Sequence, residues 1–147
     1  MVRTNIVGFR GLSGKPTFLE WVLTQLKEKK DFKAFDDFIT SSIDVGSFSE
    51  SLLAPISGPK PLGILNLASS QVASKKEFIE AIAHEFHFSL EKMSTASVKD
   101  LSGAKRGESL GLDVSRAESL LGQSLPGLKK VAKNLFFEYT KTYEISK

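Results

Sequence analysis

Apolar residues recur at helical spacing early in this chain, at Phe18, Leu19, Val22, Leu23 and Leu26. Such spacing predicts an amphipathic helix with one buried face. Thr17 precedes the run and Glu20 follows three residues later. This is the pattern of a capping box, in which both side chains accept hydrogen bonds from free backbone amides at the helix start.

The same spacing predicts three further helices. The first runs through Phe48, Leu52, Leu53 and Ile56, and the third runs through Leu128, Val131, Ala132, Leu135, Phe136 and Tyr139. In the second, Phe78, Ile79, Ile82 and Phe86 are expected to face inward. We expect Ser74 to cap the second helix and Pro126 to open the third. After the first, the chain is broken by Pro55, Gly58, Pro59 and Pro61.

A shorter helix is predicted after residue 113. Either Asp113 or Ser115 can cap it, and Gly122 can close it in the left-handed conformation that glycine adopts at low cost. Its apolar side would consist of Ala117, Leu120 and Leu121.

Extended segments alternate with these helices, at residues 2–7, 32–36, 39–45, 62–68 and 90–96. The near-continuous apolar run 62–68 is typical of a buried strand with parallel neighbours. Strands that alternate with helices predict an α/β architecture. We expect one domain over residues 1–147.

The composition is that of a globular chain, with 41% hydrophobic and 25% charged residues. No apolar run approaches the length of a membrane span, and we expect no membrane partner. The absence of cysteine excludes disulfides, thiol catalysis and cysteine–zinc sites, and fits the cytoplasm as location. The net charge is only +3 and the lysines are scattered, so we expect no nucleic-acid partner.

Residues 8–14 read G-x-x-G-x-x-G, and residues 143–147 read Y-x-x-x-K. Together the two motifs imitate the cofactor loop and catalytic pair of a complete short-chain dehydrogenase. A first Rossmann strand is nearly all apolar, but the segment before this glycine loop carries Arg3 and Asn5. Pro16 also interrupts the join to the helix, which argues equally against a phosphate-binding P-loop. We therefore assign no catalytic residue.

A metal site is not expected either. His84 and His87 are spaced i, i+3 on a predicted helix, but no third ligand accompanies them. Both are interpreted as surface residues.

Residues 105–118, K-R-G-E-S-L-G-L-D-V-S-R-A-E, combine a cationic loop with the start of a helix. The order resembles the closing block of dTDP-4-dehydrorhamnose reductases and related extended short-chain dehydrogenases, in which a loop arginine binds the diphosphate of a nucleotide sugar. The resemblance implies this role for Arg106. A guanidinium suits it because its planar fork meets two phosphate oxygens at once.

Other segments extend the resemblance over nearly the whole chain. Residues 2–8 (V-R-T-N-I-V-G) are similar to the family's strand after its catalytic tyrosine and lysine, and residues 63–68 (G-I-L-N-L-A) to a later strand. Residues 35–45 resemble the segment before the intervening helix. The resemblance implies the C-terminal part of a Rossmann-type NAD(P)-binding enzyme, with the nucleotide-binding strands, glycine loop and catalytic Tyr–Lys pair lying before Met1.

The resemblance also implies site residues near the N-terminus. Asn5 would contact the substrate diphosphate, although a strand-end asparagine can instead satisfy a loop backbone. Thr4 and Ile6 would border the nicotinamide of the cofactor, or serve only in packing.

Further candidates for substrate binding have equally open alternatives. Arg10 and Lys15 flank the glycine-rich loop and could meet phosphate oxygens or remain solvated. Phe18 would cover the nucleotide base or belong to the core. Ser41 and Ser42 could bond a sugar or phosphate, or form a turn.

The predicted function is that of the substrate-binding portion of an NAD(P)-dependent sugar-nucleotide reductase. The full-length parent would use NADP or NAD, and the isolated chain is expected to bind neither and to be inactive. Alternatives are a portion of a sugar-nucleotide epimerase or dehydratase, or a non-catalytic binding or regulatory subunit. We also expect self-association through an exposed sheet edge at residues 2–7.

Overall fold

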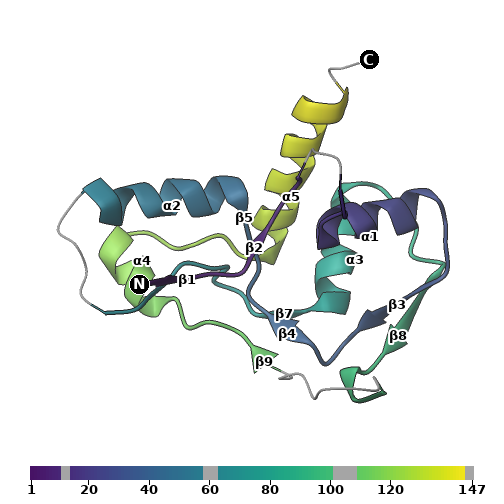
Figure 1. The fold of residues 1–147 in the computed structure, drawn as a ribbon, viewed down its shortest axis with the longest axis horizontal. Coiled ribbons are helices and arrows are strands. Elements are labelled where there is room, and N and C mark those ends of the chain that lie inside the picture. Colours follow the sequence, from purple (N-terminus) through teal and green to yellow (C-terminus); the bar gives the residue numbers. More distant parts are fainter. Residues whose placement is uncertain (11–13, 58–62, 101–108, 145–147) are drawn as a thin grey trace.

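The computed structural model describes residues 1–10, 14–57, 63–100 and 109–144. In this part of the chain short, mostly parallel strands alternate with helices (Figure 1), which confirms the predicted α/β class. No helix among the described residues is long and apolar enough to cross a membrane.

Two parallel pairs hold the N-terminal segment, β1 (Val2–Arg3) with β6 (Leu65–Asn66) and β2 (Ile6–Val7) with β5 (Ile43–Asp44). The predicted continuous strand over residues 2–7 is therefore wrong, because the chain leaves one partner and joins another at Thr4 and Asn5. The Leu67 N–H donates to the Arg3 carbonyl at 2.9 Å, and the Ile43 N–H donates to the Asn5 carbonyl at 3.0 Å. The change of partner opens the sheet between β1 and β2.

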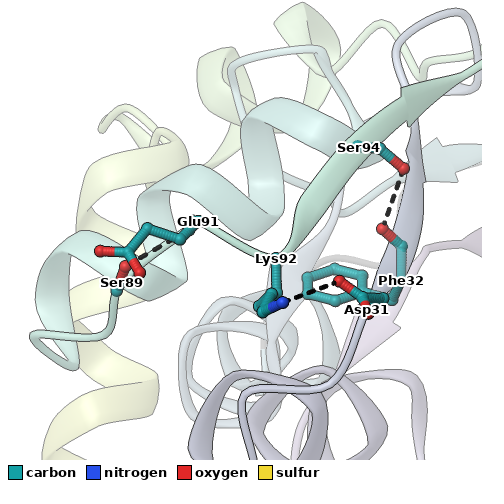
Figure 2. Close-up of polar contacts among 6 residues, drawn as sticks. All are labelled: Asp31, Phe32, Ser89, Glu91, Lys92 and Ser94. Carbon is teal, nitrogen blue, oxygen red and sulfur yellow. Dashed lines mark hydrogen bonds and ion pairs between the residues drawn. The ribbon is translucent and has the colours of Figure 1, made fainter.

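A third parallel pair joins β3 (Phe32–Phe35) to β8 (Met93–Ala96), as expected for residues 32–36 and the end of 90–96. Figure 2 shows the polar contacts at the start of this pair. Ser94 Oγ donates to the Phe32 carbonyl at 3.3 Å, and Lys92 Nζ lies 3.5 Å from Asp31 Oδ1. The ion pair is exposed on both sides and therefore adds little stability.

The predicted strand 39–45 is divided into β4 (Ile39–Thr40) and β5, and α2 already begins at Val45. β4 pairs antiparallel with β7 (Ala73–Ser74) and parallel with β9 (Ser109–Leu110). Of the expected strand 62–68, Leu62 lies outside the described residues, and within residues 63–68 regular pairing is confined to β6. Its predicted parallel direction is confirmed. Each strand pair is short, because its two strands run beside each other over only a few residues before the backbone turns away.

The capping box predicted at the start of α1 (Phe18–Lys27) and the cap predicted at Ser74 for α3 (Lys75–Glu85) are both confirmed. Thr17 Oγ1 accepts from the Glu20 N–H at 3.2 Å, and Glu20 Oε2 accepts from the Thr17 N–H at 2.7 Å. Ser74 and Glu77 exchange the equivalent bonds in α3. Local side-chain chemistry thus determines where these two helices begin.

The remaining helical elements are α2 (Val45–Ser57), the 3₁₀ turn η1 (Val98–Asp100), α4 (Ser115–Leu121) and α5 (Leu128–Tyr139), which continues into the π-helical turn η2 (Thr140–Glu144). Pro55, expected among the residues that break the chain after this helix, lies inside α2, in its last turn, where its missing N–H removes one helical bond. Helix α5 begins two residues after Pro126.

The start of α4 differs from the prediction, while its end agrees. Val114 occupies the N-cap position, and Asp113 Oδ1 accepts a bond from the Ser115 N–H at 3.0 Å just before the helix. Gly122 closes the helix with a φ of 66°. Ala117 is fully buried, but Leu120, predicted on the apolar side, is 48% exposed.

Two apolar clusters form the interior. The first lies between α1, α3, α5 and β3, and contains Leu19, Val22, Leu23, Leu26, Phe32, Ala34, Phe78, Ile79, Ile82, Ala83, Phe86, Val131, Ala132 and Leu135. The second lies between β5, β6 and α4, with Phe48 and Leu52 of α2 packed against it, and contains Ile43, Leu65, Leu67, Ala68, Val114, Ala117 and Leu125. In Figure 1, β1 and β2 run between the helices that cover these clusters.

Candidate binding cleft

A cleft of about 880 Å³ opens where β1 and β2 separate. Its walls come from the N-terminal segment, from β4, from the start of α3 and from the segment that contains β9. The lining residues are Val2, Arg3, Thr4, Asn5, Phe38, Thr40, Lys75, Ser109, Leu110, Gly111 and Leu112. We call this the binding cleft.

The binding cleft carries positive charge on a largely apolar surface. Arg3 and Lys75 contribute positive charge, and no aspartate or glutamate among the described residues lines the cleft. The side chains of Thr4, Asn5 and Thr40 add hydrogen-bonding groups. This combination suits an anion that also carries hydroxyl or carbonyl groups.

Lys75 is the first residue of α3 and is half-buried. Its ammonium lies 4.5 Å from the ring centre of Phe18 and 5.8 Å from that of Phe38. No ion pair joins it to a carboxylate in the described part of the chain. Burial lowers the pKa of Lys75 from its usual value, because the charged form loses contact with water.

A chain of hydrogen bonds supports the Asn5 side of the cleft. Asn5 Nδ2 donates to Ser42 Oγ at 3.3 Å, and the hydroxyls of Ser42 and Thr40 lie 3.3 Å apart. Ser42 and Thr40 are buried, at 8% and 4% exposed. They hold the Asn5 amide where β1 gives way to β2.

Ser41 supports the opposite wall. It is fully buried, and its Oγ accepts a hydrogen bond from the Leu112 N–H at 2.9 Å, across 71 positions of sequence. Beside it, a Cβ at Gly111 would lie 2.6 Å from Val72 Cγ1, so a larger residue would displace the Val72 side chain. The first contact draws residues 109–112 against β4, and the second draws them against Val72, which directly precedes β7.

The sequence candidates thus fall into separate groups. Thr4 and Asn5 line the cleft, whereas Ser41 and Ser42 lie behind it in internal hydrogen bonds. Ile6 is 44% exposed on β2 and is not part of the lining.

Phe18 lies in a neighbouring apolar cavity of about 200 Å³, lined also by Trp21, Phe35, Phe38 and Lys75 among others. Lys75 and Phe38 belong to both spaces. Phe18 itself is 37% exposed and packs against the buried ring of Phe78, so it is part core and part cavity wall.

Arg10 and Lys15 are exposed and do not line the cleft. The Arg10 N–H donates to Glu20 Oε1 at 2.9 Å, which ties this loop to the start of α1. Arg106 lies outside the described residues; along the sequence it precedes Ser109 of the cleft by three positions.

Sequence reasoning missed Arg3, Phe38, Thr40 and Lys75 as cleft residues. One signal was present at Lys75, because a lysine in the first turn of a helix opposes the helix dipole. The other three residues carry no comparable local signal.

The histidines occupy the predicted surface positions. His84 and His87 are exposed, and His84 Nδ1 lies 3.5 Å from Glu85 Oε1. The described residues contain no group of three or more histidine, aspartate or glutamate side chains placed to hold a metal ion.

These short parallel pairs and covering helices are those of a partial Rossmann-like fold, as found in extended short-chain dehydrogenases. The family resemblance of the sequence is thereby confirmed at the level of the fold. No protein-family model matches the sequence, and a search of the curated proteins finds no match.

Among solved structures, dTDP-4-dehydrorhamnose reductase from Bacillus anthracis in complex with NADP superimposes with a TM-score of 0.78 at 18% identity, over 93% of this chain and 47% of that one. The Bordetella bronchiseptica enzyme WbmG in complex with NAD and UDP superimposes with a TM-score of 0.70 at 18% identity, over 98% of this chain and 43% of that one. UDP-glucuronic acid 4-epimerase from Bacillus cereus superimposes with a TM-score of 0.66 at 14% identity, over 97% of this chain and 44% of that one. The chain spans slightly less than half the length of these structures.

Proposed function

We propose that this chain is the substrate-binding, C-terminal portion of an NAD(P)-dependent sugar-nucleotide reductase that resembles dTDP-4-dehydrorhamnose reductase. One observation carries the proposal: among the described residues, the binding cleft presents Arg3, Asn5 and Lys75, and no aspartate or glutamate lines it. A nucleotide sugar brings a diphosphate that needs cations and donors, and a sugar that needs hydroxyl and amide partners. The fold shared with reductases of this kind supports the same assignment.

In this proposal the diphosphate lies near Asn5, with its charge balanced by Arg3 and by Arg106 of the loop before Ser109. Thr4 and Ile6 border the nicotinamide side. These two residues offer small or apolar groups and no cation, so they suit the ring of the cofactor and not its phosphates. The cofactor would supply the hydride that reduces the keto group of the sugar.

A test with little structural disturbance uses Asn5→Asp. The shapes of the two side chains match, and the carboxylate can accept from Ser42 where the amide donates. We expect calorimetric titration to show binding of thymidine or uridine diphosphate to the unmodified chain and a loss of at least tenfold in Asn5→Asp, since a carboxylate repels phosphate. A nucleoside without phosphates serves as control and should bind both proteins equally. If neither diphosphate binds the unmodified chain, the proposal fails.

Arg106 provides a second test, with its neighbour as control. In the full-length enzyme Arg106→Ala should weaken nucleotide-sugar binding by about 1.5–3 kcal/mol, the value of hydrogen bonds to charged groups. Arg106→Lys should restore only part, because an ammonium lacks the planar fork. Lys105→Ala should cost less than half as much. Equal losses at both positions would indicate diffuse electrostatics in place of a specific contact.

A sugar-nucleotide epimerase remains the second candidate, because the Bacillus cereus UDP-glucuronic acid 4-epimerase matches 97% of this chain. The full-length enzyme separates the two by stoichiometry. A reductase consumes one NADH or NADPH for each product, whereas an epimerase leaves the total of reduced cofactor unchanged.

A further inference from the structure

Lys75 stands at the boundary between the binding cleft and the neighbouring apolar cavity, which both include it and Phe38 in their walls. We propose that Lys75 selects an anionic ligand, by pairing its ammonium with a phosphate-type group that enters the binding cleft beside the rings of Phe18 and Phe38. The proposal deepens the function given above and rests on it, and it assigns the selection to a residue that the resemblance does not mark as a site residue.

The first argument concerns the burial of the charge. The ammonium is half-buried, and no carboxylate pairs with it in the part of the chain that the structure describes. Long cationic side chains usually extend to water, since removing an ammonium from water costs free energy unless an anion compensates it. The lowered pKa of Lys75 has the same cause. An anion in the cleft would provide this compensation.

The second argument is that α3 does not need this charge. The helix start is already satisfied by the capping box of Ser74 and Glu77. A positive charge in the first turn faces the positive end of the helix dipole and opposes it. Lys75 therefore adds nothing to the capping of α3, which leaves its charge available for binding.

The third argument is geometry. The faces of Phe18 and Phe38, at 4.5 and 5.8 Å, hold the ammonium by cation–π attraction at the edge of the cleft. Rings accept no conventional hydrogen bond, so the donors of the ammonium remain available to oxygen atoms. Arg3 adds a second cation to the same cleft, which favours a multiply charged group over a single carboxylate.

The decisive comparison is Lys75→Met against Lys76→Met. The two lysines are adjacent in the first turn of α3, so both changes remove one charge near the dipole, but only Lys75 lines the cleft. With inorganic pyrophosphate as probe in calorimetric titration, we expect Lys75→Met to weaken binding by about 10- to 100-fold, the value of a hydrogen bond to a charged group. Lys76→Met should change it less than about threefold, because Lys76 does not line the cleft.

A second measurement does not depend on a variant. The lysines are reductively methylated with ¹³C, and the dimethyl-lysine resonance with the lowest titration midpoint is followed by NMR. Its midpoint should move to higher pH once pyrophosphate is added, because a paired ammonium holds its proton more tightly. An unchanged midpoint would overturn the proposal, as would equal affinities of Lys75→Met and the unmodified chain.

Thymidine diphosphate separates this inference from the proposed function. If it binds the unmodified chain and Lys75→Met equally well, the inference fails and the function stands. If pyrophosphate binding depends on Lys75 but the nucleoside adds no affinity, the anion site is real and the nucleotide-sugar function fails. If neither probe binds the unmodified chain, both fail.

Discussion

Ser41 offers the sharpest test of how the binding cleft is built. Its hydroxyl is fully buried and accepts the Leu112 N–H at 2.9 Å. In Ser41→Ala this N–H loses its acceptor, which costs about 1–3 kcal/mol for a buried donor. Leu112 is only partly buried, and water can approach it, so we expect the lower part of the range, about 1–2 kcal/mol.

Urea unfolding followed by circular dichroism measures this change. The midpoint should fall while the slope stays constant, because the surface exposed on unfolding is unchanged. In thermal unfolding, about 1–2 kcal/mol corresponds to a drop of roughly 3–8 °C for a chain of this size. The loss should be accompanied by only a small change in ligand affinity.

Ser49→Ala is the matched control. Ser49 is exposed on α2 and its hydroxyl donates to the Val45 carbonyl within the helix. Alanine is the better helix former, so stability should change by less than about 0.5 kcal/mol. If Ser41→Ala proved as stable as Ser49→Ala but lost tenfold in nucleoside-diphosphate affinity, Ser41 would contact ligand directly and our reasoning would be wrong.

Three further changes test the fold. Ser74→Ala removes half of the α3 capping box and should cost about 1 kcal/mol in urea unfolding. Gly122→Ala should cost about 1–2 kcal/mol by the same measurement, because φ is 66° there. Burial and the nearby Asp44 carboxylate raise the pKa of Glu138, so the folded state binds more protons, and this contribution to stability is lost as the pH rises through that pKa. Glu138→Gln should therefore gain stability relative to the unmodified protein as the pH rises from acid to neutral. If the difference in unfolding free energy between the two proteins were the same at pH 4 and pH 7, this reasoning would be contradicted.

Self-association through β1 and β2 stays a prediction. Val2 and Ile6 are 40% and 44% exposed, which leaves apolar surface on this edge in the chain as described. Sedimentation at increasing concentration measures it directly, and a monomer at all concentrations would contradict it.

The helices and the class of fold followed from local sequence. Thr17 with Glu20, and Ser74 with Glu77, are three residues apart, so the atoms that begin each helix are neighbours in the sequence. Gly122 closes α4 through its own backbone freedom. Helical spacing also predicted the buried faces of α1, α3 and α5, because a 3.6-residue period is a property of one segment.

The tertiary structure alone decided the strand boundaries and most of the cleft. The break at Thr4 and Asn5 exists because β1 and β2 have different partners, β6 and β5, which lie far along the chain. Leu112, the partner of Ser41, is 71 positions away. The burial of the Lys75 charge between Phe18 and Phe38 likewise joins three segments. Strand pairing, burial and the pKa of a side chain depend on which surfaces contact each other in the folded protein, and the local sequence pattern does not specify those contacts.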